Sequence, residues 1–198
     1  MKFFLFVLLL SQNSFSQKSE LDFFIKKESQ LRVSGDASII NFVCHLKNAF
    51  DMTPFKLKGN RVDELNRLSE GKIIVPIENL DCGQKGINED MKELLKAEEF
   101  PEIILDFKEL AVAKWKKEEK SGHFLSSIFS KIEITLAGVP VVYPVHLNLV
   151  KIDENNILAS GSKKLKITDF NLKPKAYLFG LVKIKELIEI DFELVLTK

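Results

Sequence analysis

The stretch that decides the fold is residues 132–149, IEITLAGVPVVYPVHLNL. Its first part alternates the apolar residues Ile132, Ile134 and Leu136 with polar ones, and after a turn-forming AGVP segment the alternation continues to Leu149. Successive side chains of a β-strand point to opposite faces of a sheet, so a period of two is typical of a strand with one buried face. The stretch therefore predicts two antiparallel strands joined by a tight turn.

The same period of two recurs on both sides of this hairpin. Turn-forming residues separate the apolar runs, as in the DENN segment at 153–156, and the chain closes with a clean alternation at 188–196. The other candidate strands are residues 30–34, 39–47, 55–65, 72–80, 103–108, 157–168 and 176–185. Many strands joined by short turns predict an all-β fold, an antiparallel barrel or sandwich.

One segment, residues 88–100, departs from this pattern. Asn88 can cap a helix, and the acidic residues that follow it suit the positive end of the helix dipole. Phe100 precedes Pro101, and a residue before proline is disfavoured in the helical conformation. We therefore expect one short helix between two strands, placed as a lid or plug of a barrel.

Length and charge exclude two broad classes of protein. The chain has 198 residues, which is enough for one domain with a real core and too little for several. It carries 29 Lys and Arg against 28 Asp and Glu, a formal net charge of +1. Nucleic-acid binding depends on a concentrated positive field, so the sequence predicts no nucleic-acid partner.

The N-terminus has the pattern of a secretory signal peptide. Lys2 is followed by the apolar run FFLFVLLL at 3–10, and Ser14 and Ser16 occupy the small-residue positions before a cleavage point. The alternative is an N-terminal membrane anchor, but eight helical residues span only about 12 Å of a hydrocarbon core of roughly 30 Å. We expect residues 1–16 to be a signal peptide and 17–198 to form a single domain without a transmembrane segment, in the periplasm or secreted.

The two cysteines, Cys44 and Cys82, have one possible pairing. In an oxidising compartment an even number of cysteines favours a disulfide, while the alternative is two separate buried thiols. Neither a CxxC pair nor a Cys/His cluster with zinc spacing is present in the sequence, so no metal site is predicted.

Catalytic motifs are missing from the sequence. The three histidines, His45, His123 and His146, form no HxH, HxxxH or HExxH pattern, and no GxSxG elbow or phosphate-binding glycine loop occurs. The sequence therefore predicts a protein that is not an enzyme and needs no cofactor, with a hydrolase kept as a minor alternative.

Four segments resemble the YceI-like family: 31–44, 87–107, 132–149, and 165–170 followed by 188–196. Their order and spacing are more specific than any one of them. The resemblance implies a lipocalin-like barrel of eight antiparallel strands with one helix. It also implies a hydrophobic tunnel that, in characterised members, holds a polyisoprenoid or another long-chain amphiphile.

We therefore expect non-enzymatic binding of a lipid-like ligand, such as a polyisoprenoid, a quinone or a fatty acid, in the barrel interior. Inward faces of alternating strands, with two positions taken from the family motifs, supply the candidate ligand-binding residues: Phe42, Ile103, Leu105, Phe107, Ile132, Ile134, Leu136, Val145, Leu147, Leu149 and Phe170. The alternative is a barrel with a filled core that binds a protein partner, for example through the charged loop at 114–122. The sequence leaves a homodimer open.

Overall fold

Strands make up most of the described structure, in agreement with the period of two in the sequence. The computed structural model describes residues 18–37, 41–47, 50, 53–62, 65–69, 71–121, 123–173, 176–177 and 182–198, so the expected leader at 1–16 lies outside the described residues. The strands are β1 (Lys18–Ile25), β2 (Gln30–Ala37), β3 (Asn41–Leu46), β4 (Thr53–Val62), β5 (Leu65–Ser69), β6 (Gly71–Pro76), β7 (Leu80–Asp81), β8 (Glu102–Val112), β9 (Lys116–Lys117), β10 (Phe124–Leu136), β11 (Val139–Lys151), β12 (Asn156–Lys166), β13 (Ala176–Tyr177) and β14 (Val182–Thr197). The helical elements are α1 (Lys85–Leu94) and two 3₁₀ turns, η1 (Ile77–Asn79) and η2 (Ile167–Phe170).

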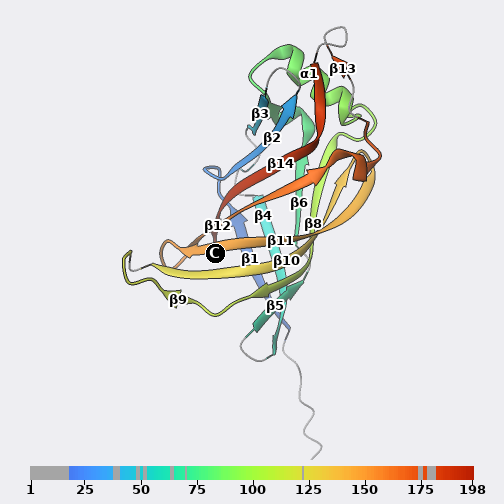
Figure 1. Ribbon diagram of the computed structural model, residues 1–198. Coiled ribbons are helices and arrows are strands. Elements are labelled where there is room, and N and C mark those ends of the chain that lie inside the picture. Colours follow the sequence, from blue (N-terminus) through green and yellow to red (C-terminus); the bar gives the residue numbers. More distant parts are fainter. Residues whose placement is uncertain are drawn as a thin grey trace, which may run out of the picture.

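The strands close into an antiparallel barrel (Figure 1). The pairing order is β1-β4-β5-β8-β10-β11-β12-β14, and β14 returns to β1 through the pairs Phe24–Thr197 and Ile25–Leu196. Towards the helix end, β2, β3 and β7 extend the sheet from β14, and β6 pairs with β8. The described residues form a sheet of 14 strands, more than the eight expected, because short strands such as β7 and β9 add to the long ones. The predicted all-β barrel with one helix is confirmed.

The hairpin predicted at 132–149 is β10 and β11, which pair from Phe124–Lys151 down to Leu136–Val139. Ala137 and Gly138 form the two-residue turn, with φ of 47° and 75°. Two consecutive residues with positive φ are the mark of the hairpin turn whose twist matches that of the strands. Gly138 also has no room for a side chain, because a Cβ there would lie 2.5 Å from the Phe100 ring.

We expect the substitution Gly138→Ala to lower the free energy of unfolding by about 1 to 2 kcal/mol or more, since an L-residue in the left-handed region costs that amount before any clash. The matched control is Gly86→Ala in α1, where a Cβ meets nothing within 4 Å. Alanine is the better helix former, so that change should be neutral or slightly stabilising. Urea denaturation measures both values, and equal effects of the two substitutions would contradict this account of the turn.

The helix begins and ends earlier than the sequence indicated. α1 starts at Lys85 with Gln84 as its N-cap and ends at Leu94, and Lys96 follows with a φ of 53°. Asn88 is therefore inside the helix, and the prediction that it caps the helix was wrong. No helix among the described residues is long and apolar enough to cross a membrane.

The side chain of Asn88 fastens the helix to the loop before it. Its Oδ1 accepts a hydrogen bond from the Cys82 backbone N–H at 2.6 Å, and its Nδ2 donates to the Asp81 carboxylate at 3.0 Å. The same carboxylate also accepts hydrogen bonds from Lys47 and from the Gly83 backbone N–H. These hydrogen bonds, of which the one from Lys47 has the largest effect, hold the pKa of Asp81 well below its usual value. Asn and Asp side chains favour such turns as strongly as helix caps, and sequence alone does not separate the two roles.

The predicted disulfide between Cys44 and Cys82 is present. Cys44 lies on β3 with no exposed surface, and Cys82 packs against the core from the loop before α1. The bond therefore ties the helix end of the barrel to β3.

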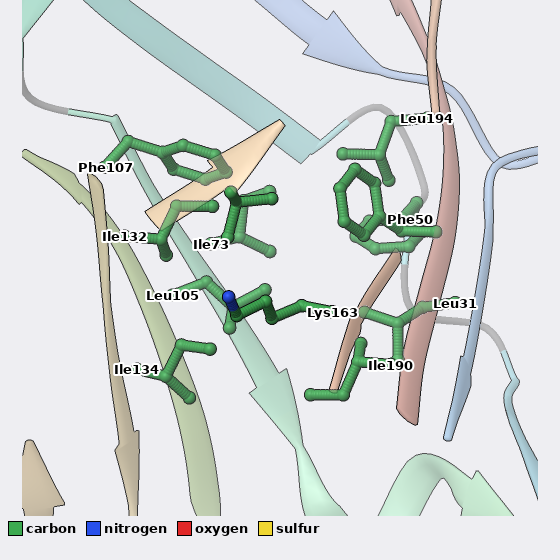
Figure 2. Close-up of a pocket in the computed structure, with 12 residues that line it drawn as sticks. Leu31, Phe50, Ile73, Leu105, Phe107, Ile132, Ile134, Lys163, Ile190 and Leu194 are labelled. Atoms are coloured by element: carbon green, nitrogen blue, oxygen red, sulfur yellow. The ribbon is translucent and has the colours of Figure 1, made fainter. Parts of the chain in front are cut away.

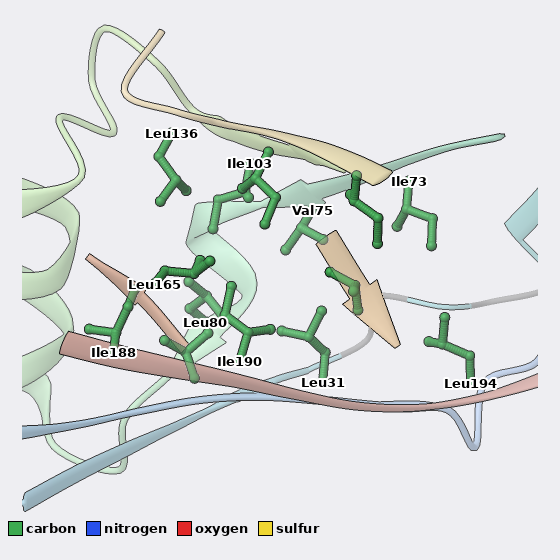
Figure 3. Packing of buried hydrophobic residues seen from close by; sticks show 14 of the residues in the cluster. Leu31, Ile73, Val75, Leu80, Ile103, Leu136, Leu165, Ile188, Ile190 and Leu194 are labelled. Atoms are coloured by element: carbon green, nitrogen blue, oxygen red, sulfur yellow. The ribbon is translucent and has the colours of Figure 1, made fainter. Parts of the chain in front are cut away.

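Aliphatic side chains from all sides of the barrel meet in its interior (Figure 3). Leu31 of β2, Ile73 of β6 and Ile190 of β14 are among them, and each is at least nine-tenths buried. The rings of Phe55 and Phe107 also lie in this core and contact edge to face, with centroids 5.4 Å apart. The inward faces of the strands thus form one continuous apolar core.

Candidate functional site

The barrel interior contains a cavity of about 30 Å³ next to Phe107 (Figure 2). We refer to it as the central cavity. Among the described residues, its wall is aliphatic or aromatic at every position except Lys163. The lining residues are Leu31, Phe50, Ile73, Leu105, Phe107, Ile132, Ile134, Val145, Lys163, Ile190, Phe192 and Leu194.

A second cavity, also about 30 Å³, lies towards α1, and Ile190 lines both. Its wall comes from the helix and from the strands of the helix end of the barrel. The lining residues are Val33, Phe42, Leu80, Met91, Leu94, Leu95, Ile103, Leu136, Ile167, Ile188 and Ile190. We call it the helix-side cavity.

The sequence-predicted residues divide between these two cavities and the packed core. Those on the wall of the central cavity are Leu105, Phe107, Ile132, Ile134 and Val145. Those on the wall of the helix-side cavity are Phe42, Ile103 and Leu136. The other three, Leu147, Leu149 and Phe170, are buried in the core outside both linings.

Sequence reasoning missed seven residues that line the central cavity: Leu31, Phe50, Ile73, Lys163, Ile190, Phe192 and Leu194. Phe50 and Lys163 are the two whose omission has a particular cause. Phe50 is a single residue between two predicted strands, and no periodicity indicated that its ring is buried. Lys163 did carry a signal. Side chains two positions apart on a strand share a face, and Leu165 is buried, so Lys163 lies on the inward face of β12. Lysine is rarely found on a buried face.

Lys163 lies where β11 and β12 separate. The two strands pair over Asn148–Lys151 and Ile157–Ser160, and within the described residues they make no further pair towards the helix end. There η2 packs against both strands and against β14. The wall next to Lys163 is therefore closed by side chains and by η2 rather than by a backbone ladder.

Tyr143 of β11 and Asp169 of η2 form the closure at this point. The Tyr143 hydroxyl donates to the Asp169 carboxylate at 2.7 Å, and the Tyr143 ring lies 6.1 Å from the Phe170 ring. Burial, followed by the hydrogen bond to Asp169, raises the pKa of Tyr143 above its ordinary value. Tyr143 thus stays a neutral hydrogen-bond donor. The Lys163 ammonium lies over the Tyr143 ring, with its Nζ 5.5 Å from the ring centroid, which is a cation–π contact.

Ser130 is a second polar group in the apolar interior. It lies on β10 between the inward residues Ile128 and Ile132, has no exposed surface, and its Oγ has no hydrogen-bond partner. Ser130 pairs with Val145, which lines the central cavity. A buried hydroxyl without a partner loses its hydration without compensation, which costs about 1 to 3 kcal/mol.

The described residues bring no catalytic or metal-binding cluster together. His45, His123 and His146 are each exposed, on β3, in the loop before β10 and on the outer face of β11. Among the described residues no group of three or more His, Cys, Asp or Glu side chains could hold a metal ion.

Solved structures with the same fold include proteins from three bacteria. A polyisoprenoid-binding domain from Saccharophagus degradans, implicated in plant cell wall breakdown, superimposes with a TM-score of 0.64 at 15% identity over 88% of this chain and 97% of its own. BcnA of Burkholderia cenocepacia gives 0.61 at 14% identity over 85% and 96%. The YceI protein of Campylobacter jejuni gives 0.50 at 14% identity over 66% and 73%. At these identities the likeness shows the fold alone.

A comparison with curated proteins found no match. The family model of the YceI-like domain matches residues 18–196, which include every strand described above except the last residue of β14, Thr197. The sequence resemblance, the closed barrel and this match agree, and the chain belongs to the YceI-like domain family.

Proposed function

We propose that this chain binds a long apolar or amphiphilic molecule inside the barrel and catalyses no reaction on it. The observation that carries the proposal is the wall of the central cavity, where every described lining residue but one is apolar. Burying a hydrocarbon chain against such a wall is favourable by about 25 cal/mol per Å². The ligand class that we propose is a polyisoprenoid, a quinone or a fatty-acid-like lipid, and the polyisoprenoid-binding domain of S. degradans, which shares this fold, supports the first of these.

A ligand chain needs more room than the two cavities offer. Each is about 30 Å³, which is about the share of one molecule in liquid water. Phe50 is 4% exposed and its ring projects into the central cavity (Figure 2). Binding therefore requires that Phe50 and its neighbours move apart, and Phe50 is one of three phenylalanines, with Phe107 and Phe192, that line this cavity.

We further propose that the protein works outside the cytoplasm. The Cys44–Cys82 disulfide supports this location, because disulfides persist in oxidising compartments and are rare in the reducing cytosol. The signal-peptide pattern of residues 1–16 points the same way.

The second candidate function is a barrel with a filled core that binds a protein partner. The small volume of both cavities favours it. Its surface would be the charged connection at 114–121, which includes β9 and the exposed Trp115. Titration with a lipid separates the two candidates, because a filled barrel binds no chain.

We expect the substitution Phe50→Ala to tighten binding of a C20 polyisoprenoid alcohol by about three- to tenfold. The shortened side chain leaves an apolar cavity, and such cavities accept apolar guests readily. The measurement is a titration of delipidated protein, followed by native mass spectrometry. Phe124→Ala is the control, because Phe124 is 44% exposed at the start of β10. Unchanged affinity in Phe50→Ala, or an equal gain in the control, would count against binding in the central cavity.

A further inference from the structure

Lys163 is the one charged side chain among the twelve residues that line the central cavity (Figure 2). It belongs to the inward face of β12, with the buried Leu165 two positions further along, and it pairs across the sheet with Ile190 of the same wall. Its neighbours Ser162 and Lys164 face outward and are exposed. β12 thus directs the Lys163 side chain towards the interior and the Lys164 side chain to solvent.

The described residues leave this ammonium without an anion. Its contact there is the Tyr143 ring, and no carboxylate of the described residues forms an ion pair with it. An ammonium has three N–H donors, and a face of an aromatic ring satisfies one side of it. Charge held against an apolar wall is favourable only when an opposite charge and hydrogen bonds compensate the lost hydration.

The Ser130 hydroxyl is an independent polar group of the interior, next to the wall of the central cavity rather than among its lining residues. It is fully buried without a hydrogen-bond partner, and its cross-strand neighbour Val145 lines the cavity together with Lys163. A hydroxyl of this kind is a donor that a ligand oxygen can satisfy. The interior therefore holds two groups that can donate to a ligand oxygen, the Lys163 ammonium and the Ser130 hydroxyl, and the described residues that line the central cavity include no carboxylate.

We propose that the central cavity binds a single-chain amphiphile with an anionic head group, a carboxylate, which pairs with the Lys163 ammonium and accepts a hydrogen bond from Ser130. The inference rests on the proposed function and specifies its ligand. The head group lies beside Tyr143 at the point where β11 and β12 separate, and the hydrocarbon chain runs along the apolar wall towards Phe107 and Phe50. A neutral alcohol of the same length would leave the ammonium without its counter-charge.

The experiment compares palmitate with hexadecanol, which share a chain of sixteen carbons and differ in head-group charge. Delipidated protein is titrated with each by displacement of an apolar fluorescent dye at neutral pH. We expect the wild-type protein to bind palmitate about 10- to 100-fold more tightly, the range for hydrogen bonds between charged groups.

Variants of the two donors separate charge recognition from packing. Lys163→Met keeps an unbranched side chain of similar length and should remove the preference for palmitate while leaving hexadecanol binding within about threefold. Lys163→Arg should restore most of the preference. Ser130→Ala should weaken palmitate alone, by about three- to tenfold. The matched control is Lys164→Met, one position along β12 on the exposed face, which should change neither affinity.

Each outcome decides one question. Equal binding of the two lipids by the wild-type protein, or equal losses for both in Lys163→Met, overturns the head-group inference and leaves binding in the barrel standing. Failure of the wild-type protein to bind either lipid overturns the inference, and if it also fails to bind the C20 polyisoprenoid alcohol, the proposed function is overturned with it. Thermal unfolding of each variant identifies any that fails to fold, and in that case Lys163→Gln replaces Lys163→Met.

Discussion

Replacing Phe170 by alanine is expected to lower the free energy of unfolding by about 3 to 5 kcal/mol. Phe170 ends η2, has no exposed surface and is the largest fully buried side chain of the described core. Its ring packs beside Tyr143 where the ladder between β11 and β12 has ended. Removing the ring leaves a cavity that the surrounding strands cannot fill by a small shift.

The measurement is urea denaturation of the variant, read as a change in midpoint at constant slope. Phe129→Ala is the matched control, because Phe129 lies on the outer face of β10 and is 56% exposed. Its loss should change stability by no more than about 0.5 kcal/mol. If the two alanine variants lost the same stability, the result would contradict the account of Phe170 as a fully buried core residue.

Removal of the disulfide is expected to have the next largest effect, about 3 to 4 kcal/mol. The bond joins residues 38 positions apart, and in the chain-entropy model a loop of that length restricts the unfolded chain by this amount. The double variant Cys44→Ala with Cys82→Ala is preferred over serine, because a hydroxyl at the fully buried position 44 would itself destabilise the fold.

The wild-type protein provides the comparison for this variant. Reductant should lower the urea midpoint of the wild type to near that of the double variant and leave the variant unchanged. A double variant as stable as the oxidised wild type would show that the bond adds no stability to the barrel.

The β10–β11 hairpin could be predicted from sequence because every level of description agrees there. The apolar alternation, the turn residues and the left-handed conformation of Gly138 all favour the same two strands. The helix could be predicted as an element, but its start could not, since Asn88 suits a helix cap and a loop hydrogen bond equally well.

Strands that depend on distant partners were harder to identify. β1 (Lys18–Ile25) was missed, although Phe23 and Ile25 are buried, because its ladder is formed with β4 and with the far end of β14. The strand expected at 55–65 was wrong as a single element: β4 ends at Val62 and β5 begins at Leu65, and the two pair as a hairpin. A period of two shows that a segment is extended, not where it turns back.

The cavity walls could be predicted only in part, for a related reason. Alternation shows which residues of a strand face inward, but the closure of the barrel decides which of them reach a cavity. Leu147 and Leu149 face inward and are packed, while Val145 on the same strand lines the central cavity. Lys163 has a clear place in the alternation, but a charged residue on a strand is usually solvent-facing, so its type argues against an inward position.

The most direct test of the central claim is native mass spectrometry of the protein purified from its own host. The account predicts one apolar or amphiphilic molecule bound per chain, released on denaturation and identified by its mass. In the Phe50→Ala variant, occupancy should rise. A protein that carries no lipid from its host and takes up none after delipidation would contradict the account and favour the barrel with a filled core.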